Sequence, residues 1–354
     1  MSELWKSNWT ETQRHFLDWW AHRGLVLGMW GAPKAATPRG ELPDPGPPPL
    51  VEAYTDPELR ARLNEFGLAR CDFPADCLPL ANADIGPGSL CLFIGGEPQF
   101  TPQSVWFHPS LRDVEEPGIL PPLKFDPDNR WWKLTEATLR AHVRRADGRY
   151  FAACPDLVEN LDILSALRDP QTTMMDMILR PEWVHEKLAE INQVFFEAYQ
   201  RIHDIIKLPD GSSCFGAFVL WGPGKTVKVQ CDAAAMISPA MFETFVVPPL
   251  AEQCAWLDHS MFHLDGIQCL DKLDALLAIE WTPQAGIEQG GSPRWYPLYK
   301  RILEAGKSVQ VVGAAPDQII PLLDAVGGKG VYIMTGFKDR GEAETIMEKA
   351  EAYR

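Results

Sequence analysis

The chain of 354 residues contains 46% hydrophobic residues and carries a formal net charge of −15, from 48 acidic and 33 basic residues. An acidic field of this size repels nucleic acid and anionic membrane surfaces, which excludes both as primary partners. The eight cysteines form no CxxC pair, and no apolar run approaches the ~18 residues of a membrane span. Because the N-terminus is too polar for a signal peptide, we expect a cytoplasmic protein with reduced thiols.

The first 50 residues differ in composition from the rest of the chain. Residues 5–20 place tryptophan and other apolar residues at helical spacing, and Thr10 and Glu11 suit a helix start, so an amphipathic helix is predicted there. The proline-rich stretch at 31–49 predicts a loop, lying either over the mouth of the main domain or on the surface as a linker. We assign 1–50 to an N-terminal helix and Pro-rich extension, and 51–354 to one domain.

In the main domain, short apolar runs alternate with longer helical patterns. Strands are expected at 150–153, 215–220, 261–262, 277–280, 309–312 and 330–334, with further candidates at 78–83 and 91–94. Helices are expected at 181–206, 239–257, 295–304, 316–323 and 342–352, with Ser238 as the N-cap of the second. Apolar strands that alternate with helices are typical of parallel strands buried on both faces.

About eight strand–helix units favour an α/β fold of the (β/α)8 TIM-barrel type. An open doubly wound sheet is disfavoured because no GxGxxG or GxxxxGK[ST] motif follows any strand. The carboxyl ends of barrel strands share one mouth. This rule gives the following candidate site residues: Asp84, Asp156, Trp221, Asp232, His263, Asp265, Trp281, Gln284 and Thr335.

His263 and Asp265 end one predicted strand. Residues two apart on a strand point the same way, so both side chains can reach one ligand. They could hold a metal ion together, or Asp265 could orient His263 as an acid–base group. A hydrogen bond at the rim with no catalytic part is the third interpretation.

Other strand ends add further candidates. Asp232 could protonate a leaving group or bind a cationic substrate, and Cys231 could be a third metal ligand or a small buried apolar residue. Asp156 could contact substrate or cap the helix that follows it. Substrate contacts are also expected from an aromatic side chain that can stack on a planar ligand and from polar groups around it: Trp281, Gln284, Glu288 and Trp221.

Three segments together resemble the uroporphyrinogen decarboxylase superfamily. They are GGEPQF at 95–100, CPDLVENLDIL at 154–164, and CDAAAMISPAMFE at 231–243 followed by HLDG at 263–266. The resemblance extends from about Val51 to the C-terminus. It implies a TIM barrel, and a homodimer is expected. The superfamily holds decarboxylases and corrinoid or coenzyme M methyltransferases, some of them zinc enzymes.

The chain departs from both branches of this superfamily. The decarboxylases carry an early R-Q-A-G-R motif that is missing here. The methyltransferases carry His-x-Cys-Gly where this chain has Asp265, and a later Cys where it has Thr335. The resemblance therefore implies a divergent member near the methyltransferase branch.

The function expected from this resemblance is one-carbon transfer on a small methylated substrate. His263 and Asp265, with Cys231 as a candidate third ligand, would hold a metal ion such as zinc or polarise the heteroatom that carries the methyl group. A corrinoid (cobalamin) would arrive on a separate protein, since the chain has no DxHxxG motif. One alternative is a decarboxylase or lyase with Asp232 or Asp265 as proton donor. Its substrate carboxylates would then need cations, for which the candidates are Arg168, Lys225 and Arg294. The other alternative is a non-catalytic barrel that binds a small ligand.

Overall fold

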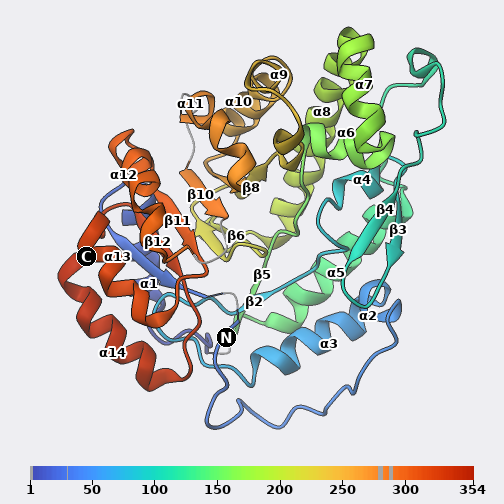
Figure 1. The fold of residues 1–354 in the computed structure, drawn as a ribbon. Coiled ribbons are helices and arrows are strands. Elements are labelled where there is room, and N and C mark those ends of the chain that lie inside the picture. Colours follow the sequence, from blue (N-terminus) through green and yellow to red (C-terminus); the bar gives the residue numbers. More distant parts are fainter. Residues whose placement is uncertain (1–2, 30, 278–281, 287–289) are drawn as a thin grey trace.

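The computed structural model describes residues 3–29, 31–277, 282–286 and 290–354. Figure 1 shows an α/β protein with strands in the middle and helices around them. The main sheet has the order β1-β12-β11-β10-β9-β8, and every neighbouring pair in it is parallel. Its strands are β1 (Leu25–Gly28), β8 (Thr226–Gln230), β9 (His259–Asp265), β10 (Thr282–Gly286), β11 (Val309–Val312) and β12 (Val331–Met334).

The remaining strands form three two-stranded units. The parallel unit is β2 (Leu80–Ala81) with β5 (Phe151–Ala152), and the two hairpins are β3 (Glu97–Phe100) with β4 (Val105–His108) and β6 (Ser213–Phe215) with β7 (Leu220–Gly222). A parallel bridge between Cys154 and Phe215 links the end of β5 to β6. The predicted α/β class with parallel strands is confirmed. The predicted closure is not: within the described residues, strand pairing does not join these sheets into one eight-stranded barrel.

Helices cover the strands and connect them. They are α1 (Trp9–Trp20), α2 (Glu52–Thr55), α3 (Pro57–Leu68), α4 (Leu90–Phe93), α5 (Arg130–Ala146), α6 (Asn160–Arg168), α7 (Pro170–Leu179), α8 (Pro181–Ile206), α9 (Pro239–Phe245), α10 (Val247–Trp256), α11 (Leu273–Leu277), α12 (Tyr296–Glu304), α13 (Ile319–Val326) and α14 (Arg340–Ala350). Two 3-10 helices, η2 (Asp232–Met236) and η3 (Ile267–Lys272), follow β8 and β9. The predicted cap at Ser238 is confirmed, because its hydroxyl accepts a hydrogen bond from the Met241 amide at 3.3 Å.

Two predicted strands are wrong. The run 215–220 is not one strand, because the chain reverses after β6 and returns antiparallel as β7, with Val219 at a φ of 51°. The run 91–94 falls largely on α4, whose four residues are all buried. A short, fully apolar run fits a buried strand and a buried helix equally well, so periodicity could not separate them. Of the predicted strand 277–280, residues 278–280 lie outside the described part of the chain.

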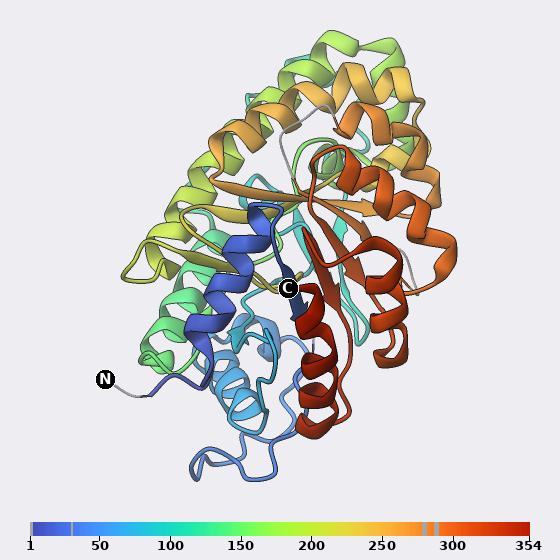
Figure 2. The same ribbon diagram turned by 90° about the vertical axis from the view of Figure 1, so that its left-hand side faces the viewer.

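The N-terminal segment belongs to the main domain instead of extending from it. β1 pairs with β12, and Phe16 and Trp19 of α1 pack edge-on against Tyr332 at 5.5 and 5.4 Å. Figure 2 shows α1 lying beside β1. The Pro-rich stretch is irregular, as predicted. It lies beside the residues that come after α3, and the Ala35 amide donates a hydrogen bond to the Arg70 carbonyl at 2.8 Å. A domain boundary at residue 50 is therefore not supported.

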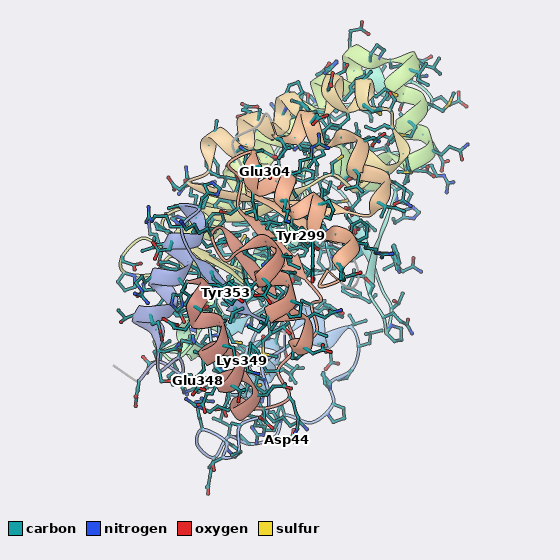
Figure 3. All side chains as sticks on the ribbon, turned by 60° about the vertical axis from the view of Figure 1, so that its left-hand side comes forward. Asp44, Tyr299, Glu304, Glu348, Lys349 and Tyr353 are labelled. Carbon is teal, nitrogen blue, oxygen red and sulfur yellow. The ribbon has the colours of Figure 1, made fainter. Side chains whose placement is uncertain are left out.

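The outer helices place charged side chains on the surface. Figure 3 shows Glu304, Glu348 and Lys349 on the outward sides of α12 and α14. Tyr299 of α12 is fully buried and donates its hydroxyl to the Gly290 carbonyl at 2.7 Å. Among the described residues, no helix has both the length and the apolar character that crossing a membrane requires.

Candidate active site

Polar side chains from adjacent strands meet inside the main sheet. Gln230 of β8 stands in register with His263 of β9, and the backbone of Gln284 in β10 continues that row. Since in-register residues of neighbouring strands share a face, Gln230 and His263 lie on the same side of the sheet. Lys228, two residues before Gln230, lies on that side as well. These side chains define the candidate site at the carboxyl ends of the strands, where open α/β sheets bind ligands.

Lys228 is the buried centre of this site. Its ammonium lies 2.7 Å from Asp156 Oδ1 and also donates to Gln230 Oε1, and its side chain is fully buried. Burial alone would lower the pKa of Lys228, but the nearby carboxylates of Asp156 and Glu159 outweigh it and hold that pKa above its ordinary value. A buried ammonium is tolerated only with such partners. Lys228 is therefore a fixed positive charge whose hydrogen bonds are committed to protein groups.

Two further carboxyl groups line the interior beside this ion pair. Asp84 Oδ1 accepts a hydrogen bond from the Asp156 amide at 2.5 Å, and Glu159 accepts one from the Gln230 amide. Burial, and then the charge of Asp156, raises the pKa of Asp84 to about 6, and burial raises the pKa of Glu159 well above its ordinary value. Both groups position the backbone around Lys228 and hold protons more readily than a carboxyl in water.

Asp232 and Asp162 form the outer part of the site. Asp232 Oδ2 accepts a hydrogen bond from Gln230 Nε2 at 2.9 Å, while Asp162 accepts from the amides of Asp232 and Ala233 at 2.7 and 2.9 Å. Loss of water around its carboxyl, and then the charge of Asp162, raises the pKa of Asp232 to about 7. A carboxyl with a pKa near neutrality at the rim of a site is suited to donate a proton to a bound molecule.

His263 and Asp265 lie close together at the strand end, as the period of two predicts. Their Nε2 and Oδ2 atoms are 4.0 Å apart, and the His263 ring packs against Phe218 with 4.6 Å between ring centroids. Phe218 also lies 5.6 Å from the Lys228 ammonium, so one ring borders both the buried lysine and the histidine. Burial raises the pKa of Asp265, an effect that the Lys228 charge partly offsets.

The predicted zinc ligands do not fit a zinc ion. Cys231 lies between the end of β8 and the start of η2, and no hydrogen bond joins it to His263 among the described residues. Burial, and then the charge of Asp162, raises the pKa of the Cys231 thiol well above its ordinary value. Over the described ranges, no three His, Cys, Asp or Glu side chains are grouped in a way that could hold a metal ion. The chemistry assigned below to the residues of this chain therefore uses no metal ion bound by them.

Trp221 is not at the mouth, contrary to prediction. It is buried in β7, donates its Nε1 proton to Ser212 Oγ at 3.0 Å, and packs edge-on against Trp9 at 5.4 Å. Its carbonyl accepts from Trp20 Nε1 at 2.9 Å. Because α1 precedes the first strand, these contacts place Trp221 among the core residues at the amino ends of the strands.

Other predicted residues have different outcomes. Asp156 belongs to the site because its carboxylate pairs with Lys228. Thr335 is buried directly after β12. Trp281, Glu288 and the side chain of Gln284 lie outside the described residues.

The basic residues suggested for holding a substrate carboxylate make other contacts. Arg168 is buried and bonds Asp176 at 2.8 Å and the Val114 carbonyl at 2.7 Å. Lys225 precedes β8, with its ammonium 3.7 Å from the Trp256 ring centroid. Arg294 is exposed, and its guanidinium lies over its neighbour Trp295 at 4.6 Å.

Sequence reasoning missed Lys228, Glu159 and Asp162. Lys228 stands in the otherwise apolar run TVKV, where a charged residue is unexpected in a strand buried on both faces. This charged residue in an apolar run is the sequence signal from which Lys228 could have been predicted. Glu159 and Asp162 lie in the segment CPDLVENLDIL, where only Asp156 was singled out.

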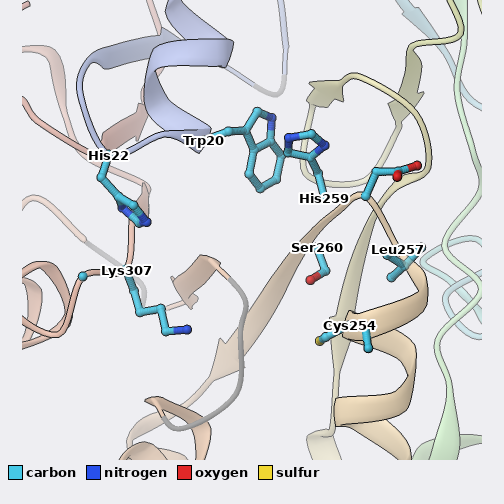
Figure 4. A pocket seen from close by; sticks show the side chains of 10 residues that line it. Trp20, His22, Cys254, Leu257, His259, Ser260 and Lys307 are labelled. Carbon is cyan, nitrogen blue, oxygen red and sulfur yellow. The ribbon is translucent and has the colours of Figure 1, made fainter.

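A second cavity lies at the opposite ends of the same strands. Figure 4 shows Trp20, His22, His259, Ser260 and Lys307 around it, and its volume is about 460 Å³. His259 and Ser260 begin β9, and Lys307 precedes β11. This cavity is therefore separate from the candidate active site.

Comparison with known proteins finds likenesses among solved structures. No protein-family model matches the chain, and no curated protein matches it. The solved structure of a methyltransferase from Methanosarcina mazei is similar over 97% of this chain and 98% of its own length, with a TM-score of 0.61 and 13% sequence identity. At this identity the likeness shows a shared fold over almost the whole chain.

Proposed function

We propose that the protein is an enzyme of one-carbon transfer, a methyltransferase that removes a methyl group from a small methylated substrate. The observation that carries the proposal is the position of Asp232: its carboxyl begins η2 just after β8, accepts a hydrogen bond from Gln230, and lies in a fold that a methyltransferase shares. Membership of the uroporphyrinogen decarboxylase superfamily, near its methyltransferase branch, is part of the same proposal.

The chemistry assigned to the site is acid-assisted methyl transfer. When the methyl group leaves, the bond between its carbon and the substrate heteroatom breaks, and the electron pair stays on the heteroatom. A proton from Asp232 then neutralises the charge that develops there. Gln230 orients the Asp232 carboxyl, and Asp162 fixes the backbone that carries it. His263 and Asp265 border the same space and would orient the substrate.

The methyl acceptor in this proposal is a corrinoid on a separate protein, which supplies a nucleophilic metal centre. The residues described above act on the substrate: they bind and orient it, and they deliver one proton to its heteroatom. A homodimer and a cytoplasmic location remain part of the proposal.

A decarboxylase is less well supported because, among the described residues, Lys228 and two of the cations suggested for substrate carboxylates already have other partners. Lys228 is committed to Asp156 and Gln230, and Arg168 and Lys225 are occupied elsewhere. The same arrangement favours a substrate without carboxylates. The experiment that follows distinguishes the proposed enzyme from a non-catalytic binding protein.

The proposal is tested by methyl transfer to free cob(I)alamin from a panel of small O- and N-methylated compounds. Appearance of methylcobalamin absorption would support it. Asp232→Asn should lower the rate about 10²–10⁴-fold. Asp204→Asn, which changes an exposed carboxylate on α8, is the matched control and should keep the full rate. Saturable ligand binding without transfer from any compound would favour the non-catalytic alternative.

A further inference from the structure

A groove of about 490 Å³ opens beside Asp232 and extends the candidate site outward. Three elements form it: β4, the α6 helix and η2. The residues that matter here are Trp106, Phe107, Asp162, Ser165, Asp232 and Met236. Because Asp162 and Asp232 belong to both the groove and the site, a molecule in the groove would reach the proton donor directly.

The groove presents large apolar side chains to solvent. Trp106 is 65% exposed and Met236 is 56% exposed, although such residues usually pack inside. An indole face attracts a positive charge, and the thioether of methionine is soft and adaptable. An aromatic wall next to carboxylates is the combination that holds alkylated ammonium ions in water.

The α6 helix supplies the polar side of the groove. Asp162 and Ser165 are three residues apart and so share one helix face. Ser165 is only 6% exposed, and its hydroxyl has no hydrogen-bond partner in the described part of the chain. Buried hydroxyl groups normally have a partner, so Ser165 offers one hydrogen bond to a molecule in the groove.

We infer that this groove binds the substrate of the proposed methyl transfer, and that this substrate is a small N-methylated amine held as its ammonium ion. The inference rests on the proposed function. The Asp162–Asp232 pair provides the negative charge once Asp232 has given its proton to the amine. Trp106 provides the ring face, and Ser165 provides a contact for a polar group of the substrate. Asp169, further along the groove, is paired with Arg112 at 2.9 Å and adds no net charge.

The ammonium form also balances the reaction. The neutral amine takes its proton from Asp232: the O–H bond of the Asp232 carboxyl breaks as the N–H bond forms, which leaves a carboxylate beside the ammonium ion. Transfer of the methyl group to the acceptor breaks the carbon–nitrogen bond, and its electron pair returns to nitrogen. The product is a neutral amine with one methyl group fewer, and the positive charge has left the groove.

Binding to the full chain tests the inference without any turnover. N,N-dimethylethanolamine, which is cationic at pH 7, and 3-methylbutan-1-ol have the same shape and hydroxyl and differ in charge. We expect calorimetry to show the amine binding at least tenfold more tightly than the alcohol. Trp106→Leu should weaken amine binding about tenfold and leave alcohol binding unchanged, whereas Trp106→Phe, which keeps a ring, should retain most of the affinity.

Ser165→Ala should weaken both ligands to a similar extent, because both carry the hydroxyl. Equal affinity for the two ligands, or a Trp106→Leu variant that binds the amine as the unaltered protein does, would overturn the inference. Methyl transfer from neutral ethers without preference for the cation would refute the inference and leave the proposed function intact. Tight, Trp106-dependent amine binding without methyl transfer would refute the function and leave the groove assignment intact.

Discussion

The Lys228 ammonium and the Asp156 carboxylate lie 2.7 Å apart, and both side chains are almost fully removed from water. Seventy-two residues separate these partners along the chain. The pair connects β8 to the segment after β5, which the described strand ladders do not join. This ion pair thus links β8 to the segment after β5 across the candidate site.

Lys228→Met should lower the free energy of unfolding by about 3–5 kcal/mol, because Asp156 would remain as a buried charge without its partner. The double variant Lys228→Met/Asp156→Leu should recover part of that loss, since neither charge then remains. Urea unfolding of the three proteins measures both values. Equal losses in the single and double variants would contradict the coupling.

The rate of methyl transfer should depend on the protonation of Asp232. The pKa of this carboxyl is raised to about 7, first by burial and then by Asp162, so the donating form predominates below that pH. The rate should therefore be highest in mild acid and fall about tenfold per pH unit above neutrality. A pH–rate profile checks this, and Asp232→Asn should remove the alkaline limb. A flat profile would show that another group supplies the proton.

Asp84 should make the fold less stable as pH rises. Burial, followed by the charge of Asp156, raises its pKa from 3.8 to about 6, so the folded protein binds this proton more tightly than the unfolded chain does. The stabilising effect is complete in acid and is lost between roughly pH 4 and pH 6. Asp84→Asn should flatten the pH dependence of unfolding across that interval by about 1–3 kcal/mol. Thermal unfolding at several pH values tests the direction, and an unchanged slope would contradict it.

His263→Ala should affect activity far more than stability. The ring is 13% exposed and packs against Phe218, so its removal should lower the free energy of unfolding by about 1–3 kcal/mol, which a stable fold tolerates. Turnover should fall severely, because the residue borders the space where the substrate lies. Calorimetry together with methyl-transfer rates checks both parts. An unfolded variant, or one with normal turnover, would make His263 a structural residue.

Trp221 and Trp106 should respond to substitution in opposite ways. Trp221→Ala should cost about 3–5 kcal/mol, because it removes a buried ring packed against Trp9 and Phe16. Trp106→Ala should change stability by less than about 0.5 kcal/mol, because that ring is 65% exposed. Melting temperatures of the two variants give the comparison. Similar losses in both would contradict the placement of Trp221 in the core.

Local patterns predicted much of the fold but only part of the site. The α8 helix was predicted with its observed bounds, because its long apolar stripe begins at a proline, and the pairing of His263 with Asp265 followed from the period of a strand. Trp221 was misplaced because the reversal between β6 and β7 has no strong turn sequence. Lys228 was missed because its partners Asp156 and Glu159 lie about 70 residues earlier, and one sequence does not show which distant charges meet.

The pairing of β1 with β12 also has a consequence for how the chain matures. Leu25 lies opposite Val331, so the first strand of the sheet finds its partner only when nearly all of the chain has been made. At the usual speed of ribosomes this interval lasts roughly 15–60 s. During that time the apolar residues of β1 and the tryptophans of α1 lack their final neighbours. Synthesis from the ribosome should therefore depend on chaperones that shield the N-terminal segment, and the yield should drop when β1 is made more apolar.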